Sequence, residues 1–338
     1  MENLIERNPN GLYCAAGDFY VDPWNPVDRA IITHAHADHL VPGSKAYVCS
    51  RLSEVLLRAR LGTEAAMESI EYGQVMERNG VRVSFHPAGH ILGSAQVRLE
   101  YHGASCVVSG DYKLAPDATC AAFEPIRCQT FVTESTFGLP IFRWPEPGDA
   151  FRELNEWWRG NQQAGKASVL FAYPLGKAQR VLAGIDSLIG PIYTHGAVEH
   201  FNRIYRESGV ALPATTYAQS APPKTDWTRA LILAPPMAKS SLWLRRFGDC
   251  STGLASGWMR IRGTRRRQSI DRGFVLSDHA DWPALLNAIR ASEAQSVWVT
   301  HGYRATLARW LVENGVDAHA IETRYEESAN AEAAEAEP

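Results

Sequence analysis

The sequence predicts an α/β protein made of two α/β parts, one inserted into the other. Short apolar runs separated by turn residues fill residues 12–109, as expected of strands joined by short connections. Apolar strands then alternate with helical patterns between residues 151 and 234, which indicates a second α/β unit. Strand and loop signals return from residue 273. At 338 residues, 45% of them apolar, the chain is long enough for this arrangement.

The individual elements follow from local periodicity. In the first third, the pattern predicts a helix over 50–61 and strand regions over 12–21, 29–33, 81–85, 96–101 and 104–109. Farther along, it predicts strands over 168–173, 229–234, 273–277 and 296–300, and helices over 151–159, 176–189 and 282–292. Residues 326–338 are mostly alanine and glutamate, and we expect a frayed or disordered acidic end there.

Composition excludes several classes of protein. The net charge is −3, so any contact with nucleic acid must come from a local basic patch. The six cysteines contain no CxxC pair, which argues against a disulfide framework or a zinc ribbon. No apolar run approaches the roughly 20 residues of a membrane span, and no signal-peptide pattern is visible. We therefore expect a cytoplasmic protein with no membrane contact.

A metal site is predicted directly after the apolar pair Ile31-Ile32. The next residues combine three imidazoles and a carboxylate, namely His34, His36, Asp38 and His39. Imidazole and carboxylate are the ligands that zinc, manganese and iron prefer. One buried histidine is easily explained as a hydrogen-bonded core residue, but unpaired polar groups are costly to bury at this density.

Three later positions repeat the same local pattern. His90, Asp111 and His301 each follow an expected strand and adjoin a glycine. Glycine lets the backbone approach a bound ion closely. Each residue alone is equally well explained as a turn aspartate or a hydrogen-bonded core histidine, but their recurrence indicates further metal ligands.

Together these motifs resemble the signature of the metallo-β-lactamase fold, a four-layer αββα sandwich with two metal ions at its edge. The resemblance implies the following ligand sets: His34, His36 and His90 for one ion, Asp38, His39 and His301 for the other, and Asp111 bridging them. It also implies that Asp22, which precedes Pro23, orients the histidine loop without touching metal.

Further motifs are similar to those of the β-CASP nuclease branch of this fold. Residues 88–95 resemble its glycine-rich third motif, and Glu134 lies in a stretch that resembles motif A. His279 lies in a stretch similar to motif B, and His301 occupies motif C. Residues 174–180 resemble part of the cap domain that this branch inserts.

The resemblance implies a domain plan. Residues 1–138 and 272–325 would form a discontinuous metallo-β-lactamase domain, and 139–271 a β-CASP-like cap that is shorter than in many of these nucleases. Residues 326–338 would lie outside both. The overall size and short cap are most similar to the bacterial ligase-associated DNA exonucleases.

This likeness implies a metal-dependent exonuclease with two zinc or manganese ions. Its expected substrate is single-stranded DNA, degraded from 5′ to 3′ in DNA repair, with an ATP-dependent DNA ligase or a helicase as functional partner. Asp38 would orient the attacking water, and His279, held by Glu134, would protonate the leaving oxygen. A neighbouring carboxylate favours the protonated form of an imidazole.

Basic residues of the cap are candidate phosphate contacts. Residues 260–267 contain five arginines, and we expect Arg262, Arg265 and Arg266, together with Lys177 and Arg180, to bind substrate. A solvated charged surface explains the arginine run equally well.

Three other functions remain open at this point. A histidine at motif C is shared by RNA-cleaving members of the branch, so an RNA-processing nuclease is the main alternative. A small-ester or thioester hydrolase explains the metal ligands but leaves the cap and motifs A and B without a purpose. An inactive nucleic-acid-binding scaffold is disfavoured, because every expected ligand position holds a ligand-type residue.

Overall fold

The computed structural model describes residues 4–267 and 269–323, and the chain divides into two compact units. Of the described residues, unit 1 contains those up to 143 and those from 279 to 323, and unit 2 contains those from 144 to 278. The boundaries expected from sequence were 138/139 and 271/272. The acidic segment 326–338 lies outside the described residues.

Unit 1 begins with a six-stranded sheet in sequence order. Its strands are β1 (Glu6–Asn8), β2 (Gly11–Cys14), β3 (Phe19–Val21), β4 (Arg29–Ile31), β5 (Ala46–Ser50) and β6 (Met67–Ile70). The expected strand region 12–21 is thus two antiparallel strands joined by a turn. Helix α1 (Glu54–Leu61) begins four residues later than expected, because Ser50 still pairs in β5 with Ile70.

A seven-stranded sheet completes the sandwich of unit 1. Its order is β19-β18-β11-β10-β9-β8-β7. The strands are β7 (Val75–Arg78), β8 (Val81–Pro87), β9 (Ala95–Tyr101), β10 (Ala104–Val108), β11 (Thr130–Thr133), β18 (Ser296–Val299) and β19 (Asp317–Ala320).

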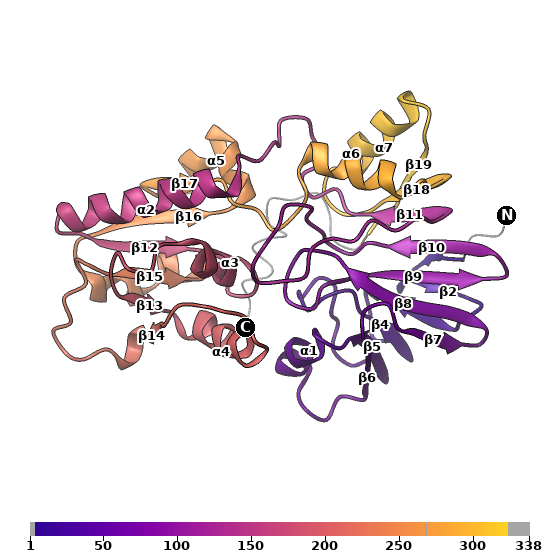
Figure 1. The fold of residues 1–338 in the computed structure, drawn as a ribbon, viewed down its shortest axis with the longest axis horizontal. Coiled ribbons are helices and arrows are strands. Elements are labelled where there is room, and N and C mark those ends of the chain that lie inside the picture. The colour runs from indigo at the N-terminus through magenta and orange to yellow at the C-terminus, as the bar shows by residue number, and fades with distance from the viewer. Residues whose placement is uncertain (1–3, 268, 324–338) are drawn as a thin grey trace. The chain divides into compact units, whose positions relative to one another are not determined.

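Side chains that alternate along these strands fill two cores. One face of the seven-stranded sheet packs against the six-stranded sheet, for example through Val83 and Phe85 against Ile31. The other face packs against helices α6 (Trp282–Ala291) and α7 (Arg304–Glu313), as Figure 1 shows. The expected α/β sandwich is therefore confirmed.

Strand direction brings most of the expected site residues that follow strands to one edge of this sheet. β8 and β10 both pair antiparallel with β9, and β10, β11 and β18 are mutually parallel neighbours. Their carboxyl ends therefore share an edge. The residues that follow these ends are His90, Asp111, Glu134 and His301. At the same edge Ala95 donates a backbone hydrogen bond to Thr33, which joins the end of β4 to the second sheet (2.9 Å).

Unit 2 is built on a parallel six-stranded sheet of order β14-β13-β15-β12-β16-β17. Its strands are β12 (Ala167–Phe171), β13 (Ile192–Thr194), β14 (Thr216–Tyr217), β15 (Leu231–Ala234), β16 (Cys250–Ala255) and β17 (Arg272–Phe274). Leu170 faces a core with Trp158 and the helices, whereas Val169 and Phe171 face the opposite side. The expected second α/β unit is confirmed.

The helices of unit 2 are α2 (Pro147–Gln163), α3 (Lys177–Gly184), α4 (Gly196–Glu207) and α5 (Arg262–Arg267), with 3-10 turns η1 (Ala218–Ser220), η2 (Pro236–Ser240), η3 (Leu242–Phe247) and η4 (Gly257–Arg260). The helix expected over 176–189 stops at Gly184, because Ile185 has an extended backbone. Likewise β17 ends at Phe274 rather than at 277, so the chain leaves the sheet four residues before the unit ends. Within the described ranges, no helix is both long and apolar enough to cross a membrane.

Candidate metal centre

Asp22 fixes both ends of the histidine loop. It follows β3 with a positive φ of 45°, which turns its side chain out of the strand. Its Oδ1 accepts a hydrogen bond from the Thr33 backbone N–H (2.8 Å). Its Oδ2 accepts one from the Thr33 hydroxyl (2.6 Å) and one from His39 Nδ1 (2.7 Å). One buried carboxylate therefore holds the residue before His34 and the last histidine of the loop.

These bonds also decide which ring nitrogens can bind a metal. The Thr33 hydroxyl donates its only proton to Asp22. It can therefore only accept a hydrogen bond from His34 Nδ1 (3.0 Å). His39 Nδ1 is likewise a donor to Asp22. Each ring is therefore neutral at Nε2 when it carries one proton, and Nε2 is the available ligand atom.

The donor set fits a bound cation. Among the described residues, the buried atoms His34 Nε2, His39 Nε2 and Asp38 Oδ1 have no hydrogen-bond partner. Buried polar atoms are almost always paired, so three unpaired acceptors in one loop are a strong departure. Neutral imidazole and carboxylate acceptors of this kind are what a divalent metal requires.

The described residues contain three overlapping groups whose ligand atoms all lie within 4.8 Å of one another. They are His34, His36, His90 and Asp111; His34, Asp38 and His39; and Asp111, Glu134 and His279. The first contains the three histidines expected for one ion. The second joins His34 to Asp38 and His39, and His301 is in none of the three.

Asp111 lies between two sets of imidazoles. Its Oδ1 is 3.5 Å from His39 Nε2, and its Oδ2 is 3.5 Å from His34 Nε2 and 3.8 Å from His90 Nε2. His36 Nδ1 and His90 Nε2 also converge, at 3.0 Å. The two carboxylate oxygens thus face different histidines, which is the placement that a shared ligand needs.

His301, like His34, is held through its Nδ1 by the hydroxyl of the threonine that precedes it. The Thr300 hydroxyl donates to the Thr133 carbonyl (3.1 Å), so it accepts from His301 Nδ1 (3.2 Å) and leaves Nε2 as the acceptor. The Ser135 hydroxyl donates to the His301 carbonyl. The His301 ring stacks on His39, with centroids 5.0 Å apart.

Electrostatics keeps most of these groups in their metal-binding form. Burial and the nearby His34 lower the pKa of His36 to about 3, and burial, with the nearby His279, lowers the pKa of His90 well below its usual value. Burial opposes the charged form of Asp111, but His39 and His279 outweigh it and lower the pKa of this carboxyl.

His39 is the exception in the metal-free protein. Burial lowers its pKa, but the carboxylates of Asp111, Asp38 and Asp22 outweigh that effect and raise the pKa well above the usual value. The cluster of carboxylates thus attracts a positive charge to this ring. A metal ion at Nε2 would take the place of that proton.

Glu134 and His279 form a pair beside Asp111. His279 Nδ1 lies 3.2 and 3.1 Å from the two carboxylate oxygens of Glu134, and 3.8 Å from Asp111 Oδ2. Glu134 Oε1 also accepts the backbone N–H of Tyr112 (2.8 Å), which fixes the carboxylate. Glu134 of the motif A-like stretch and His279 of the motif B-like stretch are therefore in direct contact.

The glycines at this edge serve loop packing. A Cβ on Gly110, which has φ of 56°, would lie 2.6 Å from the Thr33 side chain. A Cβ on Gly89, with φ of 77°, would lie 2.2 Å from the Lys113 carbonyl. The sequence interpretation attributed these glycines to close approach of an ion, but the neighbours they accommodate are other loops.

The remaining expected residues lie in unit 2. Lys177 and Arg180 are buried and both contact Asp278. Arg262 is exposed in α5, and Arg265 and Arg266 lie in the same helix. Their role in substrate binding stays a prediction.

Sequence reasoning did not assign a role to Thr33 or Thr300. A signal for both was present, because a threonine directly precedes a ligand-type histidine at 33–34 and again at 300–301.

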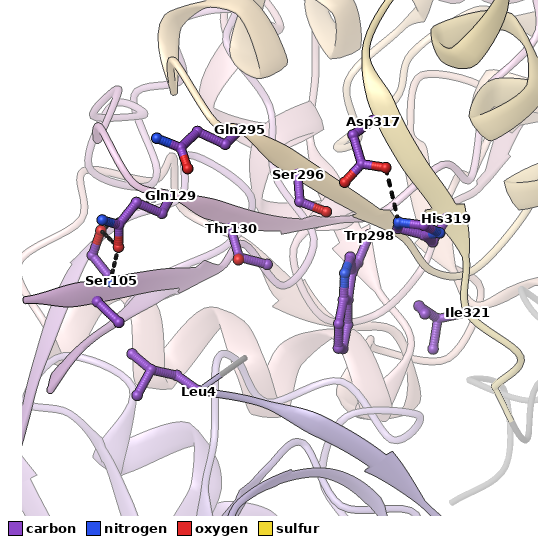
Figure 2. A pocket seen from close by; sticks show the side chains of 11 residues that line it. Leu4, Ser105, Gln129, Thr130, Gln295, Ser296, Trp298, Asp317, His319 and Ile321 are labelled. Carbon is purple, nitrogen blue, oxygen red and sulfur yellow. Dashed lines mark hydrogen bonds and ion pairs between the residues drawn. The ribbon is translucent and has the colours of Figure 1, made fainter. Parts of the chain in front are cut away.

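A large cavity of about 580 Å³ lies at the opposite edge of the seven-stranded sheet. Figure 2 shows Thr130 and Ser296, the first residues of β11 and β18, together with Trp298 at its wall. The other ends of β11 and β18 lie at the candidate metal centre. The cavity is therefore separated from that centre by the full length of these two strands. Its titratable pair, Asp317 and His319 (3.1 Å), is exposed and supplies too few ligands for a metal site.

Comparison with known proteins supports this architecture. No protein-family model matches the chain. A "Probable DNA ligase" of Opitutus terrae is 30% identical over 315 residues, which are 92% of this chain and 30% of that protein. An "RNase J-like protein" of Methanocaldococcus jannaschii is 27% identical over 53% of this chain and 50% of its own length. The chain thus spans 30% of the length of the first relative and 50% of the second.

A crystal structure of a protein of unknown function from Enterococcus faecalis V583 has a similar fold. Its TM-score is 0.57, with 14% identity over 88% of this chain and 80% of that one. At this identity the likeness concerns the fold alone.

Proposed function

We propose that this chain, which belongs to the β-CASP-type branch of the metallo-β-lactamase superfamily, is a nuclease that hydrolyses phosphodiester bonds. One observation carries the proposal. Asp111 faces two sets of imidazoles with its two oxygens, and the His279–Glu134 pair lies beside it. These placements support a site in which two cations and one proton donor would act on a single phosphate.

The residues suit two divalent metal ions. We assign His34, His36 and His90 to one ion, Asp38, His39 and His301 to the other, and Asp111 to both. Histidine-rich sites favour zinc, whereas the carboxylates are compatible with manganese. When bound, such a pair of ions supplies positive charge for a phosphate oxygen and an acidified water molecule as nucleophile.

The chain's own residues complete the chemistry. Asp38 Oδ1 is buried without a hydrogen-bond partner among the described residues, so it is suited to bind the ion. As a ligand of that ion, Asp38 would keep the attacking water oriented. His279 Nδ1 is directed at Glu134, which leaves Nε2 to carry a proton to the leaving oxygen. Glu134, fixed by the Tyr112 N–H, holds the imidazole in that orientation.

The proposed substrate is single-stranded DNA, degraded from the 5′ end during DNA repair. The match to a protein named as a probable DNA ligase over 92% of this chain supports DNA metabolism. An ATP-dependent DNA ligase or a helicase is accordingly the proposed functional partner, in the cytoplasm. Arg262, Arg265 and Arg266, on one short basic helix, are proposed to follow the phosphate backbone.

RNA processing is the second candidate function. It is favoured by the relative named as RNase J-like and by the histidine at position 301. The two candidates share the proposed metal ligands and the proposed proton donor, and they differ in the sugar of the substrate.

A time course with 5′-end-labelled single-stranded DNA and the matching RNA tests the proposal. Manganese or zinc is added, and a His36→Ala, Asp38→Ala double variant controls for contaminating nucleases. We expect release of labelled mononucleotide from DNA, and none with the double variant. Cleavage of RNA alone would support the RNA function instead. Cleavage of neither polymer, with hydrolysis of a simple ester, would overturn the nuclease assignment.

A further inference from the structure

A buried charged cluster in unit 2 precedes His279 in the chain. Lys177, Arg180 and Asp278 are 2%, 5% and 3% exposed. Lys177 Nζ lies 3.3 Å from Asp278 Oδ2, and Arg180 Nη1 lies 3.4 Å from Asp278 Oδ1. Arg180 Nη1 also donates to the Ser277 backbone carbonyl. Two cations therefore hold one dipeptide through both its side chain and its main chain.

The two cations project from a well-anchored helix start. Lys177 and Arg180 are three residues apart in α3, so they lie on one face of its first turn. The Gln179 side chain accepts the Gly176 N–H (2.7 Å) and donates to Asn202 (2.8 Å), which fixes this turn. Lys177 Nζ is 5.6 Å from the Tyr173 ring. The start of α3 is therefore a well-anchored base from which Lys177 and Arg180 contact Ser277 and Asp278.

Ser277 and Asp278, which these two cations contact, immediately precede His279 in the chain. β17 ends at Phe274, and residues 275–281 belong to neither a strand nor a helix. On the far side of His279, Ala280 donates its N–H to the Tyr112 carbonyl (2.6 Å) and Asp281 caps α6. His279 thus sits on an irregular segment that is secured immediately before and immediately after it.

We propose that Lys177 and Arg180 are positioning residues for His279. By holding Ser277 and Asp278 they set the direction in which the chain enters His279, and hence the position of its imidazole. The inference rests on the proposed function, in which His279 protonates the leaving oxygen. It gives these cations a different task from phosphate binding, because both are buried against a carboxylate.

The magnitude follows from the geometry of proton transfer. A misplacement of about 1 Å in a catalytic group can cost roughly 100-fold in rate. Loss of either cation would displace the His279 imidazole. Because His279 protonates the leaving oxygen, turnover should fall only for substrates whose leaving group needs a proton. Substrate affinity and its salt dependence, which report phosphate contacts, stay unchanged.

Two substrates and two variants test this. Arg180→Met and Lys177→Met are compared with wild type on a single-stranded oligonucleotide, whose leaving alcohol needs a proton, and on bis(p-nitrophenyl) phosphate, whose leaving phenolate does not. Arg159→Met, which removes an exposed arginine paired with Asp186 in the same unit, is the matched control.

We expect kcat on the oligonucleotide to fall at least tenfold in both variants, with KM and salt slope unchanged. Turnover of bis(p-nitrophenyl) phosphate should stay within about threefold of wild type, and Arg159→Met should match wild type on both substrates. The Arg180→Met, His279→Ala double variant should be no slower than His279→Ala alone, because both act through one imidazole.

Other results would overturn the inference. A raised KM and a flatter salt slope with unchanged kcat would assign the two cations to phosphate binding, and additive losses in the double variant would separate Arg180 from His279. If circular dichroism shows that Arg180→Met does not fold, Asp278→Asn weakens the same contacts at constant shape and carries the same expectation. Wild-type protein that cleaves neither substrate would instead defeat the proposed function itself.

Discussion

Asp22 accepts a hydrogen bond from His39 Nδ1 at 2.7 Å, and the opposite nitrogen of the same ring lies 3.5 Å from Asp111. A carboxylate outside the ligand set thus determines which atom of His39 faces the shared ligand. Through the Thr33 hydroxyl, the same carboxylate also sets the tautomer of His34. The donor set of the metal centre therefore depends on a residue that does not belong to it.

Asp22→Asn should weaken metal binding without unfolding the protein. An amide presents a donor to at least one of the groups that now donate to Asp22, so the orientation of His34 and His39 is lost. Loss of such an outer partner typically costs about 10–100-fold in metal affinity. Competition with a chelator for zinc measures it. Asp18→Asn, at an exposed aspartate with a similarly positive φ of 55°, is the control, and equal affinities in the two variants would contradict the prediction.

Asp111→Asn should lower both activity and metal content. The amide removes the negative charge that faces both sets of histidines. We expect nuclease activity to fall by roughly 10²–10³-fold or more, as for other groups that stabilise charge in a reaction. Elemental analysis should give fewer than two metal ions per chain. Asp317→Asn, at an exposed residue of the opposite edge, should retain both properties.

His279→Ala should slow cleavage of the oligonucleotide by about 10²–10⁴-fold, the usual contribution of a general acid. Metal content should not change, because His279 is not assigned to either ion. The rate on bis(p-nitrophenyl) phosphate should change little. His200→Ala removes an exposed histidine and serves as the control. A proportional loss on both substrates would refute proton donation by His279.

Metal removal should destabilise the folded protein. Without a cation, the buried atoms His34 Nε2, His39 Nε2 and Asp38 Oδ1 have no hydrogen-bond partner within the described part of the chain. A ligand present at about 100 times its Kd adds about 2.7 kcal/mol to the free energy of unfolding. Calorimetry with and without EDTA should show a lower Tm in EDTA. The His36→Ala, Asp38→Ala variant should show a much smaller difference between the two conditions.

Glu199 should make unit 2 sensitive to acid. Burial raises its pKa, but hydrogen bonds from Thr194, Thr215 and Asn202, with the charge of Arg206, outweigh this and lower it. A pKa that is lower in the folded state means that ionised Glu199 stabilises the fold above the unfolded-state value of 4.5. That contribution disappears as the pH falls through the folded-state pKa.

Glu199→Gln should accordingly reduce the free energy of unfolding by roughly 1–2 kcal/mol at pH 7, the scale of hydrogen bonds to a charged group. The difference from wild type should shrink towards pH 4 and below. Urea unfolding at the two pH values measures both quantities. Glu207→Gln, at an exposed residue of the same helix, should have little effect at either pH, and a constant deficit for Glu199→Gln would show that its charge is not involved.

The sequence by itself was sufficient for the fold class, and it singled out the residues that form the candidate centre. His34, His36, Asp38 and His39 are contiguous, so their density is visible without any structure. His90, Asp111 and His301 are detectable because each stands at the end of an apolar strand, where parallel strands present their functional groups. Both kinds of signal are local, and periodicity reports local structure well.

Only the tertiary structure decided how these residues are held. Asp22 and His39 are 17 positions apart, and Arg180 and Asp278 are 98 apart, so no local pattern encodes their contacts. The helix over 176–189 and the strand over 273–277 were predicted too long for the same reason. Periodicity continues past Gly184 and Phe274, but Ile185 has an extended backbone and the strand pairing of β17 stops at Phe274. The chemical type of each side chain can be read from the sequence. Its hydrogen-bond and ion-pair partners depend on the fold, which brings together segments that are far apart in the chain.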